Sequence, residues 1–132
     1  AGIRVGYLIA KPEIAEKLSE RIVANINMMA IEAGKAALMD DEFYTFSLKK
    51  NLEARKSIER TLENLGLTYL PSQANFVFFN AKRDVIKLGE QMLNKGIIIG
   101  RPFPPFMDWC RISTGTIEEV ELFNKAISEL YS

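Results

Sequence analysis

Apolar positions in the first third of the chain change from a continuous run to helical spacing. Ile3–Ile9 (IRVGYLI) is a short β-branched and aromatic run with little alternation, which predicts a strand buried on both faces. Pro12 then stands where the first position of a helix would be, and apolar residues follow it at helical spacing. Residues 25–39 continue as an apolar, methionine-rich helix. We therefore expect a strand, a turn and two helical segments.

Caps and glycines mark the limits of three further amphipathic helices. A long helix begins near Asp40, an N-cap residue, and ends at Gly66, a residue type that often follows a helix. A second helix begins after Asp84, and a third begins at Thr116, which forms a capping box with Glu119. Runs rich in aromatic and β-branched residues predict the strands Leu67–Leu70, Ala74–Phe79, Ile97–Ile99 and Trp109–Ser113.

The order of these elements indicates the fold class. From residue 40 onward it is helix, strand, strand, helix, strand, strand, helix, which predicts an α+β domain with a small sheet and helices packed on one face. The first 39 residues do not fit this unit as a further layer. We expect two parts: residues 1–39, a strand-helix remnant of another domain, and residues 40–132, a C-terminal small domain. Because Ala1 opens directly on the predicted strand and is not a methionine, we also expect that a preceding part of the protein is missing.

Composition and charge exclude several classes of partner. The 132 residues include 17 basic and 17 acidic side chains, which cancel and alternate along the chain, so no footprint for nucleic acid or an anionic membrane is present. No apolar run approaches the roughly 20 residues that span a bilayer. Cys110 is the single cysteine and has no partner for an internal disulfide, which fits the reduced cytoplasm.

Histidine is absent, which limits the chemistry that this chain can perform. Nucleophile systems of the Ser-His-Asp and Cys-His types are excluded, and so are histidine metal sites, so we expect no metal. Any chemistry must use lysine, arginine, tyrosine, aspartate or glutamate.

Two arginines lie within apolar strand-like runs, Arg4 in AGIRVGYLIA and Arg111 in WCRISTGT. A buried guanidinium is costly unless it finds an anion or a set of acceptors. Its planar fork matches carboxylate and phosphate oxygens in a two-point contact, which favours anion binding. Two alternatives stay open on spacing alone: each arginine pairs with a buried acid, or its strand lies at a sheet edge and the side chain reaches water.

The motifs AGIRVGY, ANFVFF and CRISTGT resemble those of class I and II aminotransferases, and within them the histidinol-phosphate aminotransferase-like branch. In that family a serine-lysine pair precedes a Gly-Leu-Ala-Gly stretch and an Arg-x-Gly-Tyr element. The resemblance implies that Arg4 binds the phosphate of pyridoxal 5'-phosphate. It also implies that the Schiff-base lysine lies upstream of Ala1, so that this chain carries no catalytic residue of its own.

The same resemblance assigns substrate contacts. Arg111 would bind the α-carboxylate of the substrate, and Asn75 would lie near the mouth of the active site. Arg101 in GIIIGRPF would lie on the substrate side, although its glycine and prolines shift the register from the family pattern. For the aromatic residues nearby we favour packing over a binding role: Tyr7, Phe103, Phe106 and Trp109.

For the full-length protein, the resemblance implies amino transfer between an amino acid and a 2-oxo acid, small molecules that pyridoxal 5'-phosphate activates. It implies a fold-type-I enzyme and a homodimer, in which residues 1–39 belong to the large cofactor-binding domain. This chain alone would be inactive. Two alternatives remain: a pyridoxal-phosphate-dependent decarboxylase or another lyase on the same fold, and a stand-alone α+β module that binds a small anion.

Overall fold

The computed structural model describes residues 2–22 and 25–132. Ala1, which opens the AGIRVGY motif, lies outside the described residues. The chain divides into two compact units, Ala1–Thr45 and Phe46–Ser132. The domain limit expected between residues 39 and 40 stays a prediction.

The described part of the first unit contains helices joined by irregular segments. Helix α1 (Pro12–Ser19) has proline at its start, as predicted, and helix α2 (Met28–Leu38) begins at Asn27, whose side chain accepts a hydrogen bond from the Met29 amide. The predicted strand Ile3–Ile9 is wrong: these residues form no strand. A strand is stabilised by hydrogen bonds to a neighbouring strand, and no described segment pairs with this run.

Helix α3 (Asp41–Asn64) is the long amphipathic helix predicted from the sequence. The Asp40 carboxylate accepts a hydrogen bond from the Phe43 amide at 2.9 Å, which satisfies one of the free donors of the first turn. The chain leaves the helix through Gly66, whose φ of 65° lies in the left-handed region that glycine adopts without steric cost. Both predicted limits of the helix are confirmed.

Three antiparallel strands form the sheet of the second unit, in the order β1 (Tyr69–Leu70), β2 (Phe76–Asn80), β3 (Trp109–Ser113). Phe78 in β2 lies opposite Arg111 in β3. The predicted strand Ile97–Ile99 is wrong. The Ile97 amide donates to the Met92 carbonyl at the end of a helix, and the segment makes one backbone bond to β3, from the Gly100 amide to the Arg111 carbonyl at 2.8 Å.

The two remaining helices begin at the predicted caps. In helix α4 (Val85–Leu93), the Asp84 carboxylate accepts hydrogen bonds from the amides of Ile86 and Lys87. In helix α5 (Ile117–Tyr131), Thr116 and Glu119 form the predicted capping box. Each cap satisfies backbone donors that a helix leaves unpaired at its first turn.

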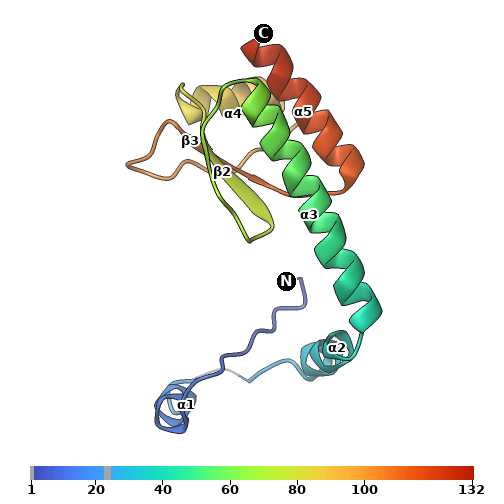
Figure 1. Ribbon diagram of the computed structural model, residues 1–132. Coiled ribbons are helices and arrows are strands. Elements are labelled where there is room, and N and C mark those ends of the chain that lie inside the picture. The colour runs from blue at the N-terminus through green and yellow to red at the C-terminus, as the bar shows by residue number, and fades with distance from the viewer. Residues whose placement is uncertain (1, 23–24) are drawn as a thin grey trace. The chain divides into compact units, whose positions relative to one another are not determined.

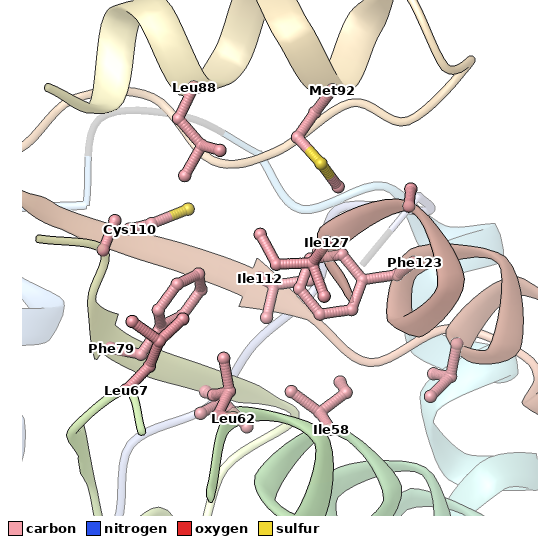
Figure 2. Packing of buried hydrophobic residues seen from close by; sticks show 14 of the residues in the cluster. Ile58, Leu62, Leu67, Phe79, Leu88, Met92, Cys110, Ile112, Phe123 and Ile127 are labelled. Carbon is pink, nitrogen blue, oxygen red and sulfur yellow. The ribbon is translucent and has the colours of Figure 1, made fainter. Parts of the chain in front are cut away.

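Helices α3, α4 and α5 bury one face of the sheet (Figures 1 and 2). Alternate residues of the two longer strands point into this core, because successive strand side chains point to opposite faces. The core residues labelled in Figure 2 are Ile58, Leu62, Leu67, Phe79, Leu88, Met92, Cys110, Ile112, Phe123 and Ile127. The α+β class with helices on one face is thereby confirmed. The opposite, open face of the sheet carries the intervening residues, which include Phe76, Phe78 and Arg111.

Candidate functional site

A hollow of about 590 Å³ lies on the open face of the sheet. Strands β2 and β3 form its floor, and the loop after β1 and the segment before β3 form its sides. We call it the Arg111 hollow, after its one charged lining residue. It is lined by Leu70, Pro71, Ser72, Gln73, Ala74, Phe76, Phe78, Phe103 and Arg111. The site is thus a largely apolar depression with a single cation in its wall.

Strand alternation places Arg111 on this face, because Cys110 and Ile112 on either side of it point into the core. Within the described part of the chain, no carboxylate lies within 4.0 Å of the guanidinium, and its buried Nε atom has no hydrogen-bond partner. The Arg111 Cζ atom lies 5.5 Å from the centre of the Phe76 ring and 5.2 Å from that of Phe103. The side chain therefore rests on aromatic faces and keeps unused donors.

Unused donors on a half-buried guanidinium bear on the alternatives left open by the sequence. Pairing with a buried acid is not what the described residues show. The other alternative stays open, because β3 lies at the edge of the three-stranded sheet and Arg111 is partly exposed, with the Gly100 amide bonded to its carbonyl. Cation–π contacts stabilise a guanidinium less than a two-point contact with an anion. The unused donors leave the guanidinium able to bind a small anion.

Arg101 brings a second guanidinium close to the hollow. Its Cζ atom lies 4.7 Å from the centre of the Phe103 ring, so both arginines pack against the same aromatic side chain. Arg101 is exposed and does not line the hollow itself. The structure therefore places this second positive charge at the rim.

Phe103 has a larger part in the site than sequence reasoning gave it. It packs edge-on against Phe78, with ring centres 5.7 Å apart, and it also lines the hollow. Trp109 packs against the same Phe78 ring at 5.2 Å, as expected for a packing residue. Tyr7, expected to pack in a core, is 77% exposed.

Asn75 has an exposed side chain that does not line the hollow, although both of its sequence neighbours do. Its carbonyl oxygen accepts hydrogen bonds from the Thr114 amide at 2.8 Å and from the Thr114 hydroxyl at 3.0 Å. These bonds tie the residue before β2 to the residue after β3. In this structure Asn75 acts through its main chain.

Arg4 lies in the first unit, where it is exposed and has a φ of 62°. A non-glycine residue in this left-handed region is uncommon, and such residues occur at turns and at functional sites. Its chemistry suits a phosphate, since a guanidinium presents several donors in one plane.

The sequence did not indicate that residues 71–74 line the site, nor that residues of α3 bond to this loop. The Ala74 carbonyl accepts hydrogen bonds from Arg55 and from Asn51. A signal for Arg55 was present, because it precedes Ile58 and Leu62 by three and seven residues and therefore shares their buried face. No signal identified the loop, since its position against β3 depends on how the strands pair.

Cys110 is the one thiol of the chain and stands next to Arg111 in sequence, but it faces the core. Burial raises the pKa of the Cys110 thiol to about 12, so that it is neutral at physiological pH. It supplies no nucleophile to the hollow.

Two observations concern wider classes of site. None of the helices in residues 2–22 and 25–132 has the length and apolarity to cross a membrane. In the same residues, no three cysteine, aspartate or glutamate side chains are grouped so that they could hold a metal ion.

Comparison with known proteins identifies the class to which this fold and site belong. The family model described as aminotransferase class I and II matches residues 1–127. The chain therefore belongs to the class I and II aminotransferases, and the resemblance seen in its motifs is confirmed.

Within this class, the chain is similar to histidinol-phosphate aminotransferases. It is 37% identical to that of Moorella thermoacetica over 133 residues, which cover 98% of this chain and 34% of the relative. A solved structure from Erwinia carotovora atroseptica is 36% identical with a TM-score of 0.91, covering 98% of this chain and 38% of that one. The Sinorhizobium meliloti enzyme, solved in complex with pyridoxal-5'-phosphate, is 26% identical with a TM-score of 0.72, covering 91% and 34%. The chain thus spans about a third of the length of these proteins.

Proposed function

We propose that the full-length protein carrying this chain is an aminotransferase, which moves an amino group between an amino acid and a 2-oxo acid. One observation carries the proposal most directly: the guanidinium of Arg111, with an unpaired buried Nε atom, stands in an apolar-walled hollow. All amino acids and 2-oxo acids share a carboxylate next to the reacting carbon. A single cation in an apolar wall can bind that group whatever the rest of the substrate is.

Arg111 binds the α-carboxylate through two parallel hydrogen bonds and so fixes the direction of the neighbouring Cα–H bond. The aromatic walls exclude water from the pair, which strengthens the electrostatic attraction. Arg101 adds a second positive charge at the rim, where it attracts anionic substrates and can contact a further acidic group. The Asn75 side chain, directed to solvent, contributes at the mouth of the site in the assembled protein.

The cofactor we propose is pyridoxal 5'-phosphate, which the relative from Sinorhizobium meliloti contains. The residues of this chain fit one part of it: the guanidinium of Arg4 suits the phosphate group. They do not supply its covalent anchor, because no lysine precedes Arg4 in this sequence. When bound, the cofactor supplies an electron sink that eases loss of the Cα proton. The lysine that holds it then lies in the part of the protein before Ala1.

Names of the relatives suggest the first amino donor to examine. Several of them are histidinol-phosphate aminotransferases, so we propose as a donor, beside amino acids, histidinol phosphate, an amine with a phosphate ester in place of the α-carboxylate. A phosphate ester, like a carboxylate, offers two oxygens to the fork of an arginine. We further propose that the enzyme acts in the cytoplasm as a homodimer, as the family resemblance implies.

A donor and acceptor panel tests this function. The full-length protein, supplied with pyridoxal 5'-phosphate, is incubated with histidinol phosphate or amino acids and with 2-oxo acids. We expect the amino group to appear on the 2-oxo acid, at a rate that depends on both partners. Release of carbon dioxide without amino transfer would overturn the proposal in favour of a decarboxylase. Binding of the anions with no reaction of any donor would favour a stand-alone anion-binding module.

A further inference from the structure

Side chains of α3 form hydrogen bonds to the loop that lines one side of the Arg111 hollow. Ala74 lines the hollow, and its carbonyl oxygen accepts hydrogen bonds from Arg55 Nη1 at 3.1 Å and from Asn51 Nδ2 at 3.4 Å. The Ala74 amide donates to the Ser72 hydroxyl at 3.1 Å, which closes the loop on itself. The loop is therefore attached to the helix at the residue that faces the ligand space.

Arg55 is the one polar residue in the buried set of the described chain, with 8% of its surface exposed. A buried guanidinium is stable only when its donors are used. Glu59, one turn further along α3, lies 3.6 Å from Arg55 Nε, and the Ala74 carbonyl takes Nη1. The Arg55 guanidinium thus pairs with the Glu59 carboxylate of the same helix and donates a hydrogen bond to the Ala74 carbonyl of the loop.

A second connection joins the same loop to the strand of Arg111. The Thr114 hydroxyl lies 2.7 Å from Asn51 Oδ1, and the Thr114 amide donates to the Asn75 carbonyl at 2.8 Å. Thr114 follows β3 directly. Helix α3, the loop 71–75 and the end of β3 therefore form one hydrogen-bonded unit around the floor and one side of the hollow.

We propose that Arg55 is a positioning residue for anion binding: it sets the distance between the loop 71–75 and the guanidinium of Arg111. This proposal rests on the proposed function, because it assumes that the hollow binds the substrate anion. Without Arg55, the Ala74 carbonyl keeps only the longer bond from Asn51, and the carboxylate of Glu59 is left unpaired. The loop then moves away from the floor, water enters the hollow and the anion is held less firmly.

Steady-state kinetics of the full-length protein test this role. The variants are Arg55→Met, which keeps the bulk of the side chain, Arg55→Lys, which keeps one donor, and Asn51→Ala. The matched control is Arg60→Met, at an exposed position of the same helix. We expect Arg55→Met to raise the KM for donor and acceptor by roughly 10- to 100-fold, the effect of misplacing a binding group by about an ångström. Arg55→Lys should recover part of this loss, Asn51→Ala should show a smaller rise, and Arg60→Met should behave as the wild type.

The double variant Arg55→Met/Arg111→Ala separates positioning from a general loss of stability. If Arg55 acts through the hollow, the double variant should have a KM no higher than that of Arg111→Ala alone, because the effects of substituting groups that act as a unit are not additive. Wild-type KM values in Arg55→Met, or an additive double variant, would overturn the proposal while Arg111→Ala still supports the proposed function. If Arg111→Ala itself leaves every KM unchanged, the proposed function fails first. Should Arg55→Met not fold, unchanged KM values in both Arg55→Lys and Asn51→Ala overturn the positioning role.

Discussion

Gly100 lies against the main chain of Arg111 so closely that a larger residue does not fit. A Cβ atom at this position would stand 2.6 Å from the Arg111 carbonyl oxygen and 3.2 Å from its Cβ atom. The Gly100 amide also donates to that carbonyl at 2.8 Å. The close approach holds the segment that leads to Arg101 beside the strand that carries Arg111. Gly100, which precedes Arg101, is therefore required by packing.

We predict that Gly100→Ala destabilises the second unit by about 1–3 kcal/mol, the usual cost of overpacking. The backbone oxygen cannot move aside as a flexible side chain would, so the segment 97–101 must shift. Urea unfolding followed by the fluorescence of the single tryptophan, Trp109, measures the change. Gly89→Ala is the control, since its Cβ would make ordinary contact with the Ile99 side chain at 3.8 Å. Equal midpoints for the two variants would contradict the account.

At the scale of single residues, the sequence predicted the caps and the arginines but not their surroundings. The N-cap of α3 and the capping box of α5 depend on contacts within four residues, and both are present. Arg111 was recognised from its apolar neighbours in one strand. The aromatic rings of Phe76 and Phe103 come from elsewhere in the chain. Whether these rings contact the guanidinium depends on how the strands pair, and the sequence pattern alone does not show the pairing.

Elements of the second unit are held together mainly by the core between the sheet and three helices. Leu88 in α4 is fully buried in this core, whereas Leu93 in the same helix is 59% exposed. We predict that Leu88→Ala lowers the free energy of unfolding by about 2–5 kcal/mol, because it removes buried methyl groups and leaves a cavity. Leu93→Ala should change it by less than about 0.5 kcal/mol. Urea unfolding of both variants measures these changes. Similar losses of unfolding free energy in the two variants would mean that Leu88 of α4 does not pack into the core.

A hydrogen bond between the start of β1 and the end of α3 makes stability depend on pH. The Tyr69 hydroxyl donates to the Glu63 carboxylate at 2.6 Å, and this bond, aided by burial and by the negative charge, raises the pKa of Tyr69 to about 12. The raised pKa favours the neutral phenol in the folded state. Its stabilising effect is therefore complete below the ordinary value of 10.0 and is lost as the pH rises toward 12.

We predict that the difference in melting temperature between the wild type and Tyr69→Phe shrinks as the pH rises from below 10.0 to about 12. Phenylalanine keeps the ring but cannot donate to Glu63, so the difference isolates this one bond. Thermal melts of both proteins across that range provide the measurement. A difference that stays constant or grows would show that the hydroxyl does not bind the carboxylate.

At the scale of elements, prediction succeeded for the helices α3, α4 and α5, whose caps and periodicity are local. The strand Trp109–Ser113 was also found, and it has a partner in β2. The runs Ile3–Ile9 and Ile97–Ile99 have the composition of strands but form none. For the first, no described segment offers a partner, and for the second, the Ile97 amide is already used to end α4. Composition indicates that a run can be a strand, and pairing decides whether it is one.

The chain as a whole matches about a third of the length of its relatives. We predict that the 132-residue chain alone catalyses no amino transfer. It contains no lysine before Arg4, where the family resemblance places the cofactor anchor. Incubation with pyridoxal 5'-phosphate and borohydride, followed by mass spectrometry, tests this. A single stoichiometric adduct on one lysine, together with turnover, would refute the prediction.

Binding of the substrate anion by Arg111 can be checked on one variant of the full-length protein, Arg111→Ala, by measuring both kcat/KM and the melting temperature. We predict that kcat/KM falls for all amino acid donors and 2-oxo acids by an amount equivalent to about 2–5 kcal/mol, because all carry the carboxylate. Arg111→Lys should recover only part of the loss, since an ammonium cannot make the two-point contact. Cofactor affinity should change little, because the phosphate is assigned to Arg4. A lower melting temperature with undiminished kcat/KM would contradict this role of Arg111.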